Sequence, residues 1–298
     1  MSGERHPRTG VASAVAAFLM WGLFPLYWKQ VASVPALEIV AHRTAWAFVF
    51  VAAWVSWRGG WRLAAAVVAS RRTLLVIATG ALLIGVNWLL YIWAVTHAHV
   101  MEGSLGYYIN PLVNVLLGVV VLRERLSRPQ AVAVALAAAG VAVLSLGYGR
   151  FPWIALALAS TFGLYGLVRK TVAADAITGL LCETAILTPA AAGYLVLRGA
   201  QGVGAFGVDT KATVLLVLGG AVTAVPLALF AYGARALPLS TLGFIQYLSP
   251  SLQFLCAVLI YGEPFTAAHA VTFACIWTAL AVLTWDARKR LRRAGARE

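Results

Sequence analysis

The chain has 298 residues, of which 62% are hydrophobic and only 11% are charged, and its formal net charge at pH 7 is +13. A soluble domain carries about 25% charged residues, so this composition excludes a water-soluble globular protein. Apolar runs of roughly 18 or more residues are typical of transmembrane helices. The composition therefore predicts an all-α integral membrane protein whose main partner is the lipid bilayer.

Ten apolar segments follow one another with short loops between them, which leaves no room for a soluble domain. The apolar run after Arg5 and Arg8 has no small-residue cleavage site, so it is interpreted as the first span and not as a signal peptide. The three cysteines lie inside apolar segments and lack metal-ligand spacing, so neither a disulfide framework nor a cofactor is predicted. We expect transmembrane helices at residues 11–29, 36–57, 73–96, 102–122, 129–147, 152–169, 178–197, 212–234, 240–261 and 267–286.

The basic residues test this count independently, because Lys and Arg accumulate in cytoplasmic loops. With both termini in the cytoplasm, 18 of the 23 basic residues lie on the cytoplasmic side and four lie on the outer side, while Arg43 falls within a span. If one span had been missed or wrongly added, the basic residues would not divide so unequally between the two sides of the membrane. The positive charge is therefore a topology signal, and nucleic acid is excluded as a partner.

The second half of the chain repeats the first. The segment YYINPLVNVLLGVVVLRE, residues 107–124, aligns with QYLSPSLQFLCAVLIYGE, residues 246–263, at a spacing of 139 residues. Each half holds five spans, an odd number, so the two copies must cross the membrane in opposite directions. Such inverted-topology repeats are common in secondary transporters, whose substrate sites lie near the bilayer midplane between the repeats.

The domain organisation follows from this repeat. We expect a cytoplasmic N-terminus at residues 1–10, a first five-helix repeat at 11–147, a second five-helix repeat at 152–286 and a basic cytoplasmic tail at 287–298.

Several motifs resemble a known family. The Tyr-x-Asn-Pro and Tyr-x-Ser-Pro turns, each followed 13 residues later by a glutamate, resemble the paired EamA domains of the drug/metabolite transporter superfamily. More narrowly, the segments EIVAHRTAW, NWLLYIWAV, EGSLGYYINPLVN, TGLLCETAILTP and STLGFIQYLSP resemble the RarD group of chloramphenicol-sensitivity proteins. The resemblance implies a ten-helix permease of the bacterial inner membrane, and it does not imply a particular substrate.

Two prolines mark the candidate transport site. Pro111 and Pro250 fall inside the fourth and ninth spans, where each removes a backbone donor. Interrupted helices at matching positions of two halves point to a binding site, although prolines that merely bend helices for packing would give the same pattern. Polar and aromatic residues surround both positions and suit a small amphipathic organic substrate. The predicted cavity residues are Asn87, Tyr91, Tyr107, Tyr108, Asn110, Asn114, Gln246 and Tyr247.

Ionisable residues at the start of the second span form a second candidate group. Arg43 lies eight residues past Pro35, roughly 12 Å along the helix, where an unpaired charge is costly. Its repeat mate is Glu183, which suggests an ion pair across the two halves, whereas Glu38 and His42 offer a local alternative. The group could serve as a static pair or as a gate, and Glu102 is a candidate for the outer gate or for proton acceptance.

The remaining candidates are interpreted as structural or are set aside. Glu124 and Glu263 end their spans shortly before the predicted N-caps Ser127 and Thr266, so they are expected to tie helix ends together. Two histidines beside Glu102 lack the further ligands of a metal site, so no metal is predicted.

These features predict a secondary permease that exports small amphipathic metabolites or drug-like compounds by alternating access, as a monomer or homodimer. The alternative is an intramembrane enzyme acting on a lipid-soluble substrate. The chain lacks the sequence motifs of metalloproteases, serine hydrolases and nucleotide-binding loops, and an enzyme would leave the inverted repeat without a purpose, so no catalytic residue is predicted.

Overall fold

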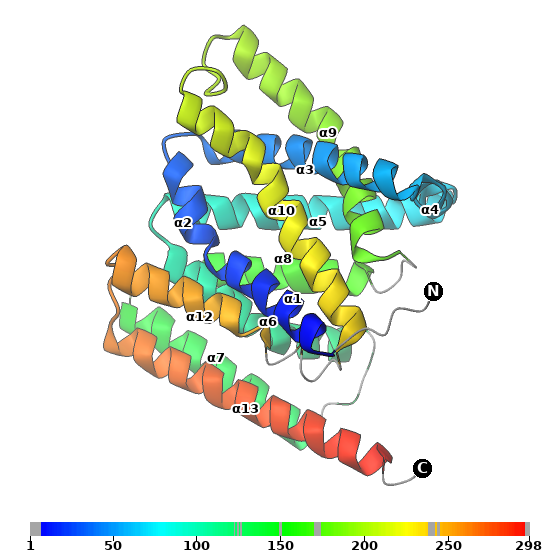
Figure 1. Ribbon diagram of the computed structural model, residues 1–298. Coiled ribbons are helices and arrows are strands. Elements are labelled where there is room, and N and C mark those ends of the chain that lie inside the picture. Colours follow the sequence, from blue (N-terminus) through cyan, green and yellow to red (C-terminus); the bar gives the residue numbers. More distant parts are fainter. Residues whose placement is uncertain are drawn as a thin grey trace.

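The computed structural model describes residues 7–121, 123, 125, 127–148, 151–169, 174–237, 242 and 245–295, and the regular structure in these residues is helical (Figure 1). The elements are α1 (Pro7–Gly22), α2 (Phe24–Trp28), the 3-10 helix η1 (Lys29–Val31), α3 (Ala36–Arg58), α4 (Trp61–Val68), α5 (Arg71–Thr96), α6 (Val100–Val120), α7 (Arg128–Tyr148), α8 (Trp153–Arg169), α9 (Ala176–Ala200), α10 (Thr210–Ala236), α12 (Leu248–Leu255), the π-helix η2 (Cys256–Ile260) and α13 (Ala267–Gly295).

Seven helices in the described part of the chain are long and apolar enough to cross a membrane, namely α3, α5, α6, α7, α9, α10 and α13. An eighth span is present if α1 and the α2–η1 segment, which are bent by 42° relative to each other, cross together. The shorter apolar helices Trp153–Arg169 and Leu248–Ile260 occupy the sixth and ninth predicted spans. The many-span all-helical architecture is thus confirmed, while the count of ten, the inverted repeat and the domain boundaries stay predictions.

Two elements differ from the expectation. The first predicted span is broken at Leu23, where Pro25 enters the first turn of α2 and its missing N–H costs nothing. The connection between α3 and α5 contains the short helix α4, which buries Ala64 and Val67 and leaves Trp61 and Leu63 exposed. Such an amphipathic helix suits the membrane interface.

The two prolines differ in their effect on the helices. Pro111 lies inside α6, which continues as one helix from Val100 to Val120. Pro250 is the third residue of α12, within the first turn, where backbone N–H groups have no intrahelical partner in any case. The ninth segment is interrupted by a turn at Gln246 and Tyr247, directly before α12, and again further along by the π-helix η2. The predicted helix break is therefore wrong at Pro111, whereas the ninth segment does have an interruption four residues before Pro250.

The two halves of the chain interlock. Helix α3 of the first half packs against α9 and α10 of the second, α1 packs against α10 and α12, and α6 packs against α12. Helices α7 and α13 lie side by side along one edge of the molecule (Figure 1). The interior where polar groups meet is consequently built from both halves.

The backbones of α3 and α10 approach closely in this interior. A Cβ atom at Gly220 would lie 2.3 Å from the carbonyl carbon of Trp46 and 2.6 Å from the backbone nitrogen of Ala47. Only a residue without a side chain lets the two helices meet here, as small residues do in other membrane helix pairs. This contact sets the register between Arg43 on α3 and Thr223 on α10.

We expect Gly220→Ala to destabilise the purified protein by about 1–3 kcal/mol, because a methyl group there overpacks a helix contact. The measurement is thermal unfolding in detergent. Gly193→Ala is the matched control, since Gly193 is helical, exposed and has no atom within 4 Å of its ideal Cβ position. Equal unfolding temperatures for the two variants would contradict the close contact.

Candidate functional site

A buried arginine surrounded by aromatic rings occupies the interior between the two halves. The Cζ atom of Arg43 lies 4.2 Å from the ring centroid of Trp88, 5.3 Å from that of Trp28 and 5.7 Å from that of Phe24. Arg43 is only 5% exposed. We call Arg43, Phe24, Trp28, Trp88 and Thr223 the Arg43 cluster. Its aromatic faces stabilise the cation, because desolvated cation–π contacts each contribute about 2 kcal/mol.

The hydrogen bond of Arg43 is to a neutral group. Its Nε donates to Thr223 Oγ1 over 2.8 Å, and the Thr223 hydroxyl in turn donates to the carbonyl of Gly219 over 2.9 Å. Arg43 comes from α3 and Thr223 from α10, so the bond crosses the boundary between the halves. It orients the guanidinium group but does not neutralise it.

Two tyrosines lie beside the Arg43 cluster. The rings of Tyr91 on α5 and Tyr107 on α6 are 5.7 Å apart, and both hydroxyls are within electrostatic range of Arg43. Tyr91 is 3% exposed, and its hydroxyl has no hydrogen-bond partner among the described residues. The structure therefore places these two predicted cavity residues next to the predicted charge.

The partner predicted for Arg43 is engaged elsewhere. Glu183 is 1% exposed, its Oε1 lies 3.6 Å from the Nε of Arg169, and its Oε2 accepts a hydrogen bond from the Tyr165 hydroxyl over 3.1 Å. Arg169 reaches it from the end of α8 by lying flat against Gly179. The prediction that Arg43 pairs with Glu183 is wrong, because a basic residue at a helix end is close enough to neutralise this carboxylate.

The local alternative for Arg43 is also wrong. Glu38 accepts a hydrogen bond from the backbone N–H of Ala205 over 2.6 Å and forms an ion pair with Arg198 Nη2 at 3.3 Å. His42, one turn further along α3, stacks on Phe206 with the ring centroids 4.9 Å apart. Both side chains thus hold the α9–α10 connection against the start of α3.

The predicted cavity amides form hydrogen bonds between helices. Asn87 Nδ2 on α5 donates to the Leu158 carbonyl over 3.0 Å and to Thr161 Oγ1 over 2.9 Å, both on α8. Asn110 Nδ2 on α6 donates to the Ala159 carbonyl over 3.3 Å, and Asn110 Oδ1 accepts from Asn114 Nδ2 over 3.0 Å. These amides join α8 to its two neighbours in this conformation.

The repeat-related tyrosines meet. The rings of Tyr108 and Tyr247 stack with their centroids 6.3 Å apart and their planes at 15°, and the Tyr108 and Ser251 hydroxyls are 2.5 Å apart. They line a cavity of about 490 Å³ between α6, α12 and α13. Gln246 beside them is exposed. The remaining lining residues are Trp277, Leu280, Ala281, Thr284 and Trp285.

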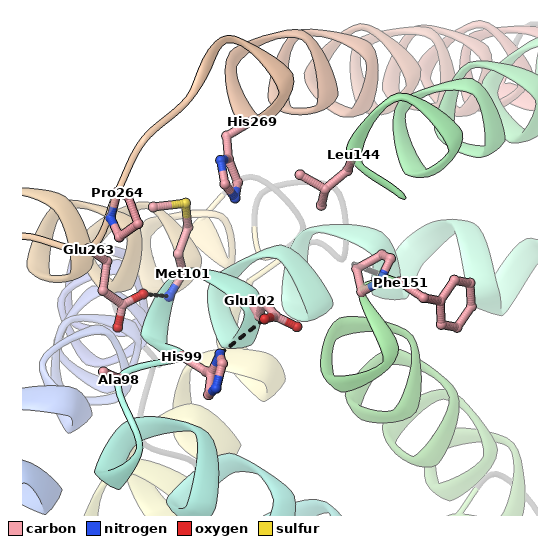
Figure 2. Close-up of a pocket in the computed structure, with 10 residues that line it drawn as sticks. Ala98, His99, Met101, Glu102, Leu144, Phe151, Glu263, Pro264 and His269 are labelled. Atoms are coloured by element: carbon pink, nitrogen blue, oxygen red, sulfur yellow. Dashed lines mark hydrogen bonds and ion pairs between the residues drawn. The ribbon is translucent and has the colours of Figure 1, made fainter. Parts of the chain in front are cut away.

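A smaller cavity of about 50 Å³ lies at the start of α6 (Figure 2). Glu263 points at the helix N-terminus, where its two oxygens accept from the backbone N–H groups of Val100 and Met101 over 2.7 and 2.8 Å. Glu102 faces His99 at 3.1 Å. Glu263 therefore ties helix ends together as expected, although the helix is α6 and not the following one. Glu124, its repeat mate, lies outside the described residues.

Thr266 and Ser127 are the N-caps that the sequence predicted. Thr266 Oγ1 accepts from the His269 backbone N–H over 3.4 Å, and Ser127 Oγ accepts from that of Gln130 over 3.4 Å. No group of three or more His, Cys, Asp or Glu side chains that could hold a metal ion is present among the described residues.

Sequence reasoning missed the residues that surround the charges. Phe24, Trp28 and Trp88 were not among the predicted site residues. Arg169 and Arg198 were not among them either, although each lies in the last turn of a helix, within reach of a buried glutamate. Their positions at helix ends were the available signal.

The two ion-pair assignments can be separated by double-mutant cycles. Glu183→Gln and Arg169→Gln should each reduce stability, by roughly 3–5 kcal/mol for the partner left charged and buried, and the double variant should lose less than the sum. Glu183→Gln combined with Arg43→Gln should be additive, because those two side chains share no partner. The measurement is the unfolding free energy in detergent. Coupling in the second cycle and additivity in the first would restore the original pairing.

Glu263 gives a second test. Glu263→Ala leaves two buried N–H groups at the start of α6 without acceptors and should cost about 1–3 kcal/mol for each, whereas Glu263→Gln keeps one acceptor and should lose less. Thermal unfolding of the purified variants is the measurement. Gln201→Ala, at an exposed position, should be neutral. A Glu263→Ala variant as stable as this control would show that solvent satisfies the helix end.

Comparison with known proteins places this geometry in a family. The model of the EamA-like transporter family matches residues 8–146. The chain is 46% identical over 287 residues to an uncharacterized transporter of Vibrio cholerae, covering 96% of this chain and 95% of that one. It is 45% identical over 289 residues to the uncharacterized transporter YojE of Bacillus subtilis, covering 95% and 96%.

Other relatives carry the RarD name. The chain is 46% identical over 290 residues to the protein RarD of Escherichia coli, covering 97% of this chain and 98% of that one. A solved crystal structure aligns with 95% of this chain and 98% of its own with a TM-score of 0.58, and at 21% identity it shows a shared fold. The chain is similar to RarD proteins over nearly its whole length, and its fold is helical with many membrane spans. This chain therefore belongs to the EamA-like transporter family of bacterial membrane proteins.

Proposed function

We propose that the protein is a secondary permease that exports small amphipathic organic molecules by alternating access between its two halves. Membership of a transporter family supports transport as such, and the transporter names of the relatives favour it over catalysis. The observation that carries the finer proposal is the cavity where Tyr108 and Tyr247 meet.

The size and lining of this cavity fit a small amphipathic compound. Ligand pockets measure about 300–1,000 Å³ and combine apolar walls with a few polar groups. The cavity of about 490 Å³ has tyrosine and tryptophan faces together with the hydroxyls of Ser251 and Thr284. Its walls come from α6 in the first half and from α12 and α13 in the second, so a rocking of one half against the other would change its access.

Two of the buried glutamates, Glu38 and Glu183, suggest how access is controlled. Glu183 and Arg198 lie 15 residues apart on α9, roughly 22 Å along the helix axis. Glu183 pairs with Arg169 near one end of α9, and Arg198 pairs with Glu38 near the other. In our proposal these ion pairs are latches on opposite sides of the membrane, of which one opens in each outward-facing or inward-facing state.

The remaining features of the proposal concern placement. The separation of basic residues along the sequence supports an inner-membrane protein with both termini in the cytoplasm. The exposed side chains of α4, among them Trp61 and Leu63, suit the cytoplasmic interface in that orientation. The protein works as a monomer or homodimer, and His42 and Glu102 lie at its outer gate.

Transport can be tested without a known substrate. Untargeted metabolomics of cells and medium, with the gene deleted or overexpressed, should reveal an organic compound that leaves the cells faster when the protein is abundant. Efflux of that compound from loaded proteoliposomes should then fall about tenfold for Tyr108→Ala or Tyr247→Ala, because each removes a cavity wall.

Tyr232→Ala is the matched control, since Tyr232 is 41% exposed on α10, away from the cavity. Unfolding temperatures measured in parallel separate lost transport from lost folding. If no compound changes its distribution with expression level, the proposed export fails.

A further inference from the structure

We propose that the Arg43 cluster binds the carboxylate of the transported molecule, so that the substrates are organic monocarboxylates with an apolar or aromatic body. This inference rests on the proposed transport function and specifies its substrate class. It starts from the hydrogen-bonding capacity that the cluster leaves unused.

The guanidinium group of Arg43 has most of its donors free. An arginine side chain carries five N–H donors in one plane. Only the Nε of Arg43 forms a hydrogen bond with a described residue, and that bond goes to Thr223. The rings of Trp88, Trp28 and Phe24 contact the charge through their faces and offer no lone pair to the N–H groups at the edge of the plane. The edge is therefore ready for a planar acceptor such as a carboxylate.

Two further buried groups around Arg43 also lack partners. The indole N–H of Trp28, which is 0% exposed, and the hydroxyl of Tyr91, which is 3% exposed, make no hydrogen bond with the described residues. Tryptophan can only donate, and a tyrosine hydroxyl can donate as well as accept. A buried polar group without a hydrogen-bond partner is costly, so an anion bound at Arg43 that also reached these two groups would remove that cost.

No protein carboxylate in the described part of the chain fills this role. The buried carboxylates on α3 and α9 each form an ion pair with a different arginine: Glu38 pairs with Arg198, and Glu183 pairs with Arg169. Arg43 thus keeps one positive charge that an incoming ligand can neutralise. An intramembrane arginine of this kind marks a substrate pathway more often than a packing position.

The chemistry of the cluster defines the ligand. One cation balances one negative charge, which favours a monocarboxylate over a dianion. The aromatic walls suit a flat apolar body next to the carboxylate. A zwitterion would bring an ammonium group into a site whose free polar groups are mainly donors, and a neutral amide would leave the charge of Arg43 uncompensated.

Binding to the purified full-length protein tests the inference directly. The probes are acetate, benzoate, phenylacetate and indole-3-acetate, measured by thermal stabilisation in detergent over a concentration series. Phenylacetamide serves as the neutral isostere, phenyl phosphate as the dianion and phenylalanine as the zwitterion. We expect the aromatic monocarboxylates to stabilise the wild-type protein, with the comparison compounds at least about tenfold weaker.

Variants connect the binding to the cluster. Arg43→Gln should weaken monocarboxylate binding at least about tenfold, and Arg43→Lys should lie between, because lysine keeps the charge without the planar fork. Tyr91→Phe removes only a hydroxyl without a partner, so the empty protein should unfold at an unchanged or higher temperature while binding weakens about threefold to tenfold. A purely structural role for Tyr91 predicts the opposite, namely lower stability and unchanged binding. This variant keeps the test decisive if Arg43→Gln does not fold.

The outcomes separate this inference from the proposed function. The inference fails if no monocarboxylate stabilises the wild-type protein more than Arg43→Gln, or if phenylacetamide binds as well as phenylacetate. It also fails if Arg43→Gln exports the compound found by metabolomics with unchanged KM, in which case transport itself stands. Absence of any exported compound would instead remove the transport proposal.

Discussion

The antiparallel contact between α3 and α10 is the constraint on which the interior depends. Gly220 lets the α10 backbone reach that of Trp46, and one turn away along both helices Thr223 meets Arg43. A side chain at position 220 would separate the helices and remove the neutral partner that orients the guanidinium group. The aromatic cage could then still contact the cation but could not fix its direction. The missing side chain at Gly220 thus helps to determine where the N–H groups of Arg43 point.

Burial in lipid explains why the polar groups of this protein are arranged in pairs and short chains. Water is not available in the bilayer core, so each buried polar group needs a protein partner. The amides of Asn87 and Asn110 find backbone carbonyls on α8, and Glu263 finds two backbone N–H groups at the start of α6. Arg43 differs from the buried glutamates in that no described group of opposite charge pairs with it, so its charge is available to a ligand.

Sequence reasoning predicted the helical segments well, because long apolar runs and short loops leave few alternatives. It failed at Pro111, since a proline's effect depends on where the helix begins, which the sequence does not give to within one turn. The contact between Tyr108 and Tyr247 was not predicted, although both were expected to line the cavity. The ion pairs were assigned wrongly for a related reason. The prediction assumed that repeat mates share a depth in the bilayer. The arginines that reach Glu38 and Glu183 come from helix ends, and their approach depends on side-chain direction and on the space beside Gly179.

The separation of Arg43 from its hydrogen-bond partner has a consequence for biosynthesis. Thr223 follows Arg43 by 180 residues, and a ribosome adds about 5–20 residues per second, so roughly 10–40 s pass before the partner is made. Arg198, which holds Glu38, follows by 160 residues. During this interval α3 carries a carboxylate and a guanidinium group into or near the membrane with only first-half residues beside them. The first half therefore stays at the insertion machinery, or incompletely packed in the membrane, until the second half is synthesised. Residues of the second half then complete the packing of α3.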